Sequence, residues 1–501
     1  MRGVPRPLAL ALARAVGLVA VGVGLVLGAT YLPAPINLAQ GATPTRATRA
    51  PAEPVTQTRL ICPGPEALGI EGLPDSLPQT VSVAAAAAPV ESLPPGLVTG
   101  PGDGSLAISG LPSGGKWAVS ATVRGQVVSG QVSTARSALV TGVGTLAPGV
   151  VATQWSWIPE GNSRGLVTAA CMPAATSSWL IAGGAGPGRL EHLVLANPGP
   201  NPVTVDLAVF GVKGRIDSPD GQGLTVAGHS RTVILLDAIA GSEPSPVVHV
   251  MARGGKVAAF LSDTWLDGIV PRGGDDVVSL AEPAREQVIA GVPIDGRAIL
   301  RVAVPGDSEA VVESRVLTSG GPRPLPADGV TRVAGRSTRD IDLSSLPPGA
   351  YAVQVRADVP VVAAAMVDRR RAAGAPSDLA WSVASLPIRT LAGMALPTSE
   401  VKGLTQRLDL AATTDPASVR VTTVGVDGRV STNEVAIAAD SVSTLSLNGA
   451  TSVWVTPLTG LVRAAVVTSV TDAGGVLLSL TPLADLTLTA TPSPLRQLRD
   501  Q

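Results

Sequence analysis

A pattern of strand-like segments recurs three times along this 501-residue chain at a nearly constant interval. Runs of alternating apolar and polar residues begin at Val203, Ala310 and Ala417, each 107 residues after the one before. Such alternation is the period of a half-buried β-strand. A unit of roughly 100 residues made of short strands has the size of an immunoglobulin-like β-sandwich. The pattern therefore predicts an all-β protein with three tandem immunoglobulin-like sandwiches.

Turn sequences repeat in the same order and support this division. VAGHS, VAGRS and IAADS end at Ser230, Ser337 and Ser441, and each precedes an apolar strand. Glycine (56 residues) and proline (44 residues) are abundant, as a fold with many turns requires. The predicted boundaries are 185–283 for repeat 1, 284–385 for repeat 2, 386–485 for repeat 3 and 486–501 for a tail.

The amino end carries a membrane signal. Arginines in a basic stub at 1–14 precede an uncharged apolar run at 15–32. As a helix this run would be about 27 Å long, close to the thickness of about 30 Å of a bilayer core. Basic residues on the near side place the stub in the cytoplasm and the rest of the chain outside. We therefore predict a single-pass protein of the cell membrane after a transmembrane helix; a cleaved signal, which would make it secreted, is the alternative.

Two segments follow this run before the first repeat. Residues 33–59 are rich in proline, alanine and threonine and are predicted to be a spacer. Residues 60–184 contain strand candidates and both cysteines of the chain, Cys62 and Cys171. Two cysteines in an exported chain favour one disulfide. Free thiols or a metal site remain alternatives, although a closed zinc site needs four ligands. We expect a further sandwich here, pinned by the disulfide.

Four motifs carry a resemblance to a known family. LICPGPE, AACMPAATSSWLIAGG, LVLANPGPNPVTVDLAVFG and LDGIVPRGGDD follow one another in this order. After an amino-terminal anchor, they closely resemble an uncharacterised family, a domain of unknown function, of exported, membrane-anchored envelope proteins from high-GC Gram-positive bacteria. The resemblance covers about residues 60–371. It implies a place in the cell envelope and, as partners, envelope polysaccharide or the large membrane glycosyltransferase often encoded beside such proteins; it implies no catalytic residues.

Carboxylates gather in the segment DTWLDGIVPRGGDD. Asp263, Asp267, Asp275 and Asp276 surround Arg272, but their spacing does not match a calcium-binding loop. We expect a solvated linker between sandwiches in which Arg272 contacts a carboxylate. A bound cation is the alternative, if the loop folds back on itself.

The three histidines do not have metal-ligand spacing. His192, His229 and His249 lie in separate segments. His249 alternates with valines and so points to the opposite face of its strand. Gln354 and Trp454 take the same place in the other repeats, and a position that accepts such different residues is expected to be exposed. We predict no cofactor and no metal. With a net charge of −1, the chain also has no cationic surplus for a nucleic-acid partner.

One catalytic motif is present but lacks its context. Residues 161–165 read G-x-S-x-G, the nucleophile elbow of α/β-hydrolases, which requires a helix after the turn. The residues that follow, LVTAACMP, predict a strand instead. The sequence therefore favours a non-catalytic, membrane-tethered binding or scaffolding module. The alternative is a carbohydrate-active or other hydrolytic enzyme with loop-borne acids such as Glu160 or Asp275, which would need two carboxylates about 5 to 10 Å apart in a pocket.

Tryptophans and carboxylates are the candidates for a contact surface. Aromatic side chains commonly line sugar-binding sites, and aromatic residues make up only 2% of this chain. Scarce large residues are also needed to fill cores, so most tryptophans are expected to be buried. The contact surface that we predict consists of Trp155, Trp157, Asp275 and Asp276.

Overall fold

The protein is described by a computed structural model. It covers residues 52–65, 80–95, 97, 103–112, 119–132, 136–370, 372, 374–397 and 401–490. Strands make up 62% and helices 2% of the fold, which confirms the all-β prediction. Among the described residues, no helix has the length and apolar character needed to cross a bilayer. The predicted basic stub at 1–14 and anchor at 15–32 lie outside them.

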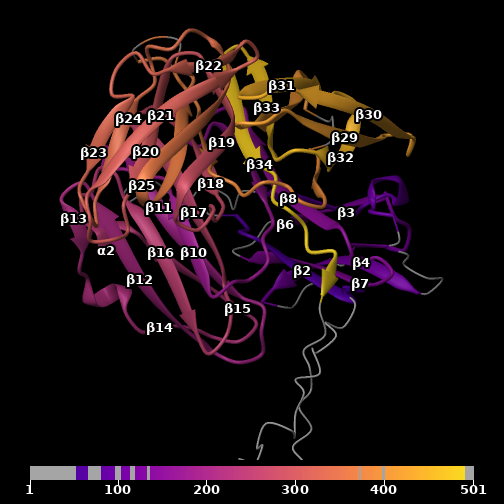
Figure 1. The fold of residues 1–501 in the computed structure, drawn as a ribbon. Helices are drawn as coiled ribbons and strands as arrows, with labels where there is room; N and C mark the ends of the chain where they lie inside the picture. The colour runs from indigo at the N-terminus through magenta and orange to yellow at the C-terminus, as the bar shows by residue number, and fades with distance from the viewer. Residues whose placement is uncertain are drawn as a thin grey trace, which may run out of the picture. The chain divides into compact units, whose positions relative to one another are not determined.

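The first domain is a sandwich of two four-stranded sheets (Figure 1). One sheet has the order β2-β7-β4-β5 and the other the order β6-β3-β8-β9. Their facing side chains, mostly valine, leucine and alanine, form one core. Among the described residues of this domain, one 3-10 turn, η1 (Val90–Ser92), follows the second strand, β3. The strands are β2 (Gln57–Cys62), β3 (Val81–Ala87), β4 (Gly104–Leu111), β5 (Val119–Ala121), β6 (Val127–Val132), β7 (Ser137–Gly144), β8 (Val150–Ile158) and β9 (Gly165–Ala170).

Repeat 1 has sheets of order β10-β16-β12-β13, with β14 also on β12, and β15-β11-β17-β18. Its first strand begins at Ser177, inside the predicted range 60–184, because this strand pairs with β16 rather than with the first domain. The short elements η2 (Pro219–Gly221) and α2 (Asp237–Ala240) lie in its loops. The strands are β10 (Ser177–Ile181), β11 (Arg189–Asn197), β12 (Val203–Gly211), β13 (Gly214–Ile216), β14 (Leu224–Val226), β15 (Ser230–Leu235), β16 (Val247–Arg253), β17 (Ala258–Asp267) and β18 (Val270–Val277).

Repeat 2 contains one long strand that belongs to both of its layers. The first half of β25 pairs with β19 and β21, and its second half pairs with β20 and β26. The strands are β19 (Ala284–Ile294), β20 (Arg297–Ala303), β21 (Ala310–Thr318), β22 (Gly321–Pro324), β23 (Val330–Val333), β24 (Thr338–Asp342), β25 (Gly349–Asp368) and β26 (Leu379–Val383).

Repeat 3 has sheets of order β27-β32-β29-β30 and β31-β28-β33-β34. A parallel bridge between Thr318 and Ser441 connects the second of these sheets to repeat 2. The strands are β27 (Ala392–Ala395), β28 (Leu404–Ala412), β29 (Ala417–Gly425), β30 (Val430–Ile437), β31 (Ser441–Ser446), β32 (Ala450–Thr459), β33 (Val462–Asp472) and β34 (Gly475–Pro482).

All four domains share one strand order. For this count, β13 with β14 and β22 with β23 are each taken as one strand, and the two halves of β25 are taken as two. The first, sixth, third and fourth strands of each domain then form one sheet, and the fifth, second, seventh and eighth form the other. The first domain is therefore a fourth copy of the unit, which the sequence pattern did not reveal. In an immunoglobulin domain the first two strands lie in one sheet. Here they lie in opposite sheets, so this order does not support the immunoglobulin-like part of the prediction.

The turn before the fifth strand has the same backbone conformation in all three predicted repeats. His229, Arg336 and Asp440 all have a left-handed backbone, with φ of 50°, 57° and 51°. This conformation is uncommon outside glycine. Its recurrence at the aligned position of VAGHS, VAGRS and IAADS is the expected result of one repeated unit.

The two ends of the folded body are tied together. Strand β1 (Glu53–Pro54) pairs antiparallel with β35 (Thr489–Ala490), and the Val55 amide donates to the Leu488 carbonyl at 3.0 Å. The described strands β1 and β35 therefore lie within the predicted spacer 33–59 and the predicted tail 486–501. Residues Glu53–Ala490 form one compact unit.

The eighth strands of the four domains meet in the interior of this unit. Strand β9 contacts β18, β18 contacts β26, β26 contacts β34, and β34 contacts β9. We call this closed circuit the four-strand junction. Because every domain contributes its last strand, the four sandwiches pack around one another instead of forming an extended row.

Candidate functional site

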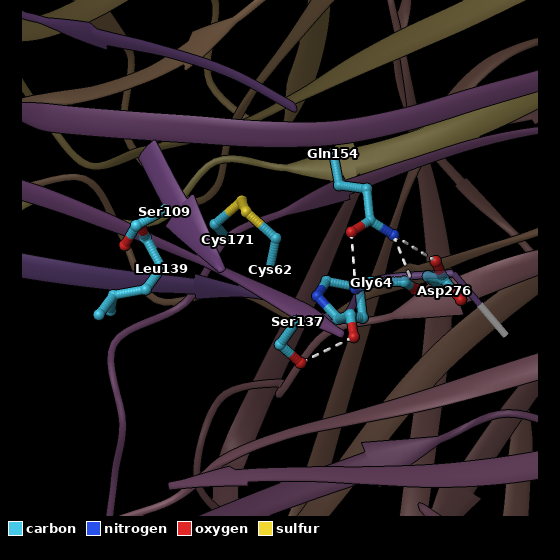
Figure 2. Close-up of a disulfide and its surroundings, with 9 residues drawn as sticks. Cys62, Gly64, Ser109, Ser137, Leu139, Gln154, Cys171 and Asp276 are labelled. Carbon is cyan, nitrogen blue, oxygen red and sulfur yellow. Dashed lines mark hydrogen bonds between the residues drawn. A yellow bond between two sulfur atoms is a disulfide. The ribbon is translucent and has the colours of Figure 1, made fainter. Parts of the chain in front are cut away.

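Cys62 and Cys171 form the predicted disulfide (Figure 2). It connects the end of β2 to the residue after β9, and so joins the two sheets of the first domain. Beside it, Ile61 and Met172 exchange two backbone hydrogen bonds of 2.8 Å each. The disulfide is therefore part of a continuous crosslink between the two sheets.

A buried glutamine connects this region to repeat 1. Gln154 is 1% exposed; its Oε1 accepts from the Gly64 amide at 2.7 Å, and its Nε2 donates to Asp276 Oδ2 at 3.2 Å (Figure 2). Burial raises the pKa of Asp276 to about 6, against hydrogen bonds from Ser262 and Gln154 that lower it. Asp276 is half-buried and bonded to the first domain, so it contributes to domain packing.

The carboxylate segment is a β-hairpin and not a solvated linker. Strands β17 and β18 place Asp263 directly opposite Asp275. Asp263 is fully buried and accepts hydrogen bonds from Arg189 Nε (2.8 Å), Arg189 Nη2 (2.6 Å), Trp381 Nε1 (2.8 Å) and the Gly183 amide (3.1 Å). Burial alone would raise the pKa of Asp263, but the charge and hydrogen bonds of Arg189 outweigh it and lower the pKa. This carboxylate is a structural ion.

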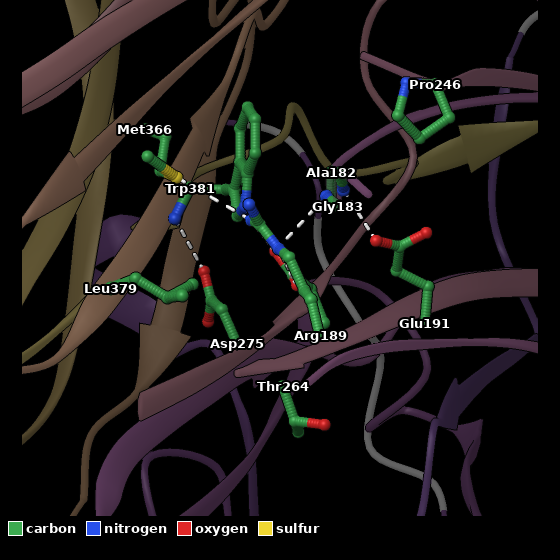
Figure 3. Close-up of polar contacts among 12 residues, drawn as sticks. Ala182, Gly183, Arg189, Glu191, Pro246, Thr264, Asp275, Met366, Leu379 and Trp381 are labelled. Atoms are coloured by element: carbon green, nitrogen blue, oxygen red, sulfur yellow. Dashed lines mark hydrogen bonds and ion pairs between the residues drawn. The ribbon is translucent and has the colours of Figure 1, made fainter. Parts of the chain in front are cut away.

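Asp275 lies in the interior and not on a contact surface. Its side chain is 2% exposed, and its Oδ2 accepts from the Trp381 amide at 2.7 Å (Figure 3). Burial raises the pKa of Asp275 well above its usual value. Arg272 does contact a carboxylate as predicted, since its Nη2 lies 2.8 Å from Asp267 Oδ2. Among the described residues, no group of three or more His, Cys, Asp or Glu side chains is placed to hold a metal ion.

A carboxyl that the sequence did not single out lies in the four-strand junction. Asp378 Oδ2 accepts from the Leu166 amide of the first domain at 3.1 Å and from the Leu478 amide of repeat 3 at 2.9 Å. Burial raises the pKa of Asp378 well above its usual value. Gly273 of repeat 1 has φ of 89°, and a Cβ there would collide with this carboxyl. One side chain of repeat 2 thus contacts the other three domains.

Hydroxyl groups and tryptophans complete the junction. The Thr168 amide of β9 donates to Ser479 Oγ of β34 at 2.8 Å, and Thr168 Oγ1 lies 2.7 Å from Thr481 Oγ1. Trp155 and Trp157 are half-buried on β8 and pack against an apolar cluster shared by the first domain and repeat 3. The tryptophans of the predicted contact surface therefore also contribute to domain packing.

Glu191 is a buried carboxyl of repeat 1 from which a pH dependence of stability follows. It is 2% exposed and accepts from the Gly184 amide at 2.5 Å. Burial, and then the charge of Asp263, raise the pKa of Glu191 to about 8. Between about pH 4.5 and pH 8 the folded state therefore holds a proton that the unfolded state has released. The contribution of this group to the free energy of unfolding is fully present below this window and is lost as the pH rises through it.

We expect the free energy of unfolding to fall between pH 5 and pH 8, by up to about 1.4 kcal/mol per pH unit for each such group. Glu191→Gln mimics the protonated acid and should make this decline shallower. Urea unfolding of both proteins at several pH values measures the difference. Equal declines in the two proteins would contradict the assignment. Exposed Glu309→Gln, 51% exposed at its side chain, is the control and should leave the decline unchanged.

His249 is part of a stacked and hydrogen-bonded cluster on repeat 1. Its ring lies parallel to Trp179 with centroids 4.0 Å apart, and its Nε2 is 3.0 Å from Ser177 Oγ. Ser177 Oγ also donates to Glu282 Oε1 at 2.8 Å. A hydroxyl has one proton and a carboxylate only accepts. The His249 Nε2–H must then donate to Ser177, so His249 does not act as a base on this serine.

The positions aligned with His249 in the other repeats are buried, and the prediction of an exposed position was wrong for them. Gln354 is 1% exposed and Trp454 is fully buried. Trp454 packs against alanines of β3, including Ala84, and Gln354 Nε2 donates to Glu286 Oε1 at 2.5 Å. The outward faces of these sheets are covered by neighbouring domains or side chains.

The G-x-S-x-G match lies in the turn of the β8–β9 hairpin. Ser163 is exposed, and Gly165 begins a strand rather than a helix. The alternative prediction, a hydrolytic enzyme, named Glu160 and Asp275 as its acids. Glu160 is exposed on the same turn, whereas Asp275 is buried. This geometry is not that of a nucleophile elbow.

A pocket of 320 Å³ opens between the first domain and repeat 1. No single motif of the sequence predicted this pocket, because its walls come from four separate segments. Its described lining residues are Arg59, Ile61, Pro173, Ala174, Asn197, Pro198, Gly199, Pro200, Asn201, Val203, Gly254, Gly255 and Lys256.

Comparisons with known proteins identify a family but no activity. No curated protein matches the chain. Among solved structures, the crystal structure of a tetra-tandem repeat in the extending region of a large adhesion protein is 14% identical over 86% of this chain and 100% of that chain, with a TM-score of 0.10, which is too low to support an argument. Residues 127–448 match a family of unknown function, DUF5719. Because the match spans more than half of the chain, the protein belongs to the DUF5719 family.

Proposed function

We propose that this protein is a non-catalytic binding or scaffolding module of the cell envelope, tethered to the membrane by its amino-terminal segment and exposed outside the cytoplasm. Its partners in this proposal are envelope polysaccharide or a membrane glycosyltransferase. The proposal includes the exported, anchored character implied by the resemblance to envelope proteins of high-GC Gram-positive bacteria. The observation that carries it is the four-strand junction, which holds four sandwiches as one body around buried polar contacts.

The carboxylates in this body support a structural role for its acids. Asp263 is ion-paired, Asp275 is buried against a backbone amide, and Asp378 accepts from amides of three strands. A glycoside hydrolase instead needs two carboxyl groups that flank a substrate in an open cleft. These three groups are committed to protein contacts, which favours binding over hydrolysis.

The disulfide and the paired ends support the location. Structural disulfides persist in oxidising compartments outside the cytoplasm. Because β1 and β35 pair, the chain enters and leaves the body at one place. A membrane tether on the amino side would thus hold the body by a single attachment, with its loops free to contact partners.

Labelling of intact cells tests the location. We expect a membrane-impermeant amine reagent to modify the exposed Lys213 and Lys256 in whole cells as strongly as in lysed cells. Peptide mass spectrometry measures both. Labelling that appears only after lysis would overturn the extracytoplasmic location.

Photo-crosslinking tests the partners. A photoreactive amino acid can replace exposed side chains of three domains: Val123 (61% exposed), Ile269 (89%) and Val426 (73%). We expect light-dependent adducts with envelope polysaccharide or with the glycosyltransferase at one or more of these positions. Irradiated wild-type cells are the control. Adducts at none of the three positions would contradict the scaffolding role.

A further inference from the structure

The pocket between the first domain and repeat 1 has a cationic lining. Its described lining residues include two basic side chains, Arg59 on β2 and Lys256 in the β16–β17 turn, and no carboxylate. Both basic side chains are exposed. Because the whole chain has a net charge of −1, the positive charge is local to this opening and not a property of the surface.

The wall from repeat 1 is held rigidly from inside. Asn197 is fully buried; its Nδ2 donates to the Asn201 carbonyl at 2.8 Å, and its Oδ1 accepts from the Gly199 amide at 2.9 Å. The His229 amide donates to the Gly199 carbonyl at 2.8 Å. These bonds fix the loop between β11 and β12 before any ligand arrives, which lowers the entropic cost of binding.

The wall from the first domain, on β2, is connected to the wall from repeat 1 by backbone hydrogen bonds. Ile61 pairs with Met172, and Ala175 exchanges hydrogen bonds of 2.9 and 3.0 Å with Val257. The segment after Cys171 therefore connects the strand that carries Arg59 to the turn that carries Lys256. The two cations are held on fixed backbone and not on independent loops.

We propose that this pocket binds a carboxylate or phosphate group of an anionic saccharide polymer. A guanidinium group pairs with the two oxygens of either anion, and an ammonium group supplies a further charge. The exposed Pro173 and Pro200 and the half-buried Pro198 offer apolar surface to the carbon skeleton of one sugar unit. The volume of 320 Å³ lies in the range of small-ligand sites, which occur preferentially at domain interfaces. This inference rests on the proposed function and specifies its ligand.

Fluorescence anisotropy with the full chain in detergent tests the inference. The probes are a labelled galacturonic acid trimer, a labelled glycerol phosphate oligomer and neutral labelled maltotriose. We expect wild type to bind at least one anionic probe and to bind maltotriose at least about tenfold more weakly. The anionic probe that binds distinguishes carboxylate from phosphate. Arg59→Glu and Lys256→Glu should each weaken binding at least about tenfold, which is about 1.4 kcal/mol.

Lys213→Glu is the matched control. Lys213 is an exposed lysine of repeat 1 outside the pocket lining, and the substitution changes the net charge by the same amount. It should leave the affinity within about twofold. The inference is overturned if neither anionic probe binds, if maltotriose binds equally well, or if Lys213→Glu weakens binding as much as the pocket variants do. Such a failure leaves the labelling and crosslinking results intact, so it is distinguishable from failure of the proposed function.

Discussion

Asp263→Ala is expected to lower the free energy of unfolding by about 3–5 kcal/mol, as removal of one partner from a buried ion pair does. Asp263 is fully buried, and Arg189 is 9% exposed at its side chain. The substitution leaves Arg189, the Trp381 indole N–H and the Gly183 amide without their acceptor. Each buried donor without a partner carries a desolvation cost. Since Trp381 belongs to repeat 2, the loss also weakens the contact between repeats 1 and 2.

Chemical denaturation followed by circular dichroism measures this effect. Asp263→Asn keeps the size of the side chain but removes its charge, so it should lie between wild type and Asp263→Ala. The matched control is the exposed pair Arg332–Glu309, whose side chains are 71% and 51% exposed. Glu309→Ala should cost less than about 1 kcal/mol. A cost for Asp263→Ala as small as that of Glu309→Ala would show that the buried pair does not stabilise the body.

Strands within each sandwich could be predicted from the sequence, because alternation is a local signal. Strands β12, β21 and β29 begin at Val203, Ala310 and Ala417, the three residues from which the repeat was recognised. The β17–β18 hairpin escaped prediction, since the glycines and aspartates of β18 have low strand propensity. Tertiary contacts outweigh that preference. The amide of Trp381 donates to the buried carboxyl of Asp275 on β18, and Arg189 donates to the buried carboxylate of Asp263 on the partner strand β17.

Contacts between the sandwiches could not be predicted in the same way. Asp378 accepts from residues 212 positions before it and 100 positions after it, and no periodic pattern records such a distance. Trp454 alternates outward from its own sandwich, as predicted, yet a neighbouring sandwich covers it. The candidate pocket has the same origin, because its lining comes from four segments that only domain packing brings together. Periodicity indicates which side chains point away from the core of a sandwich, but it does not indicate what packs against them.

Replacement of both cysteines by serine is expected to lower the free energy of unfolding by about 2–5 kcal/mol. The disulfide closes a loop of 109 residues, and in the chain-entropy account a loop near 100 residues contributes about 4.7 kcal/mol by restricting the unfolded chain. Both cysteines are buried, at 0% and 5% exposure, so the serine hydroxyls add a cost in the folded state.

Reductant provides the control for this double variant. Wild type unfolded in urea with dithiothreitol should shift towards the curve of the double variant, whereas the variant itself should not respond. Ile61 and Met172 keep their two 2.8 Å backbone hydrogen bonds without the sulfur bridge, so the folded structure should be retained. Near-ultraviolet circular dichroism in the absence of urea checks this retention. Equal unfolding midpoints for the double variant and oxidised wild type would contradict a stabilising bridge. A shift with unchanged dichroism would show that the bridge stabilises the protein without altering the packing that holds the four domains.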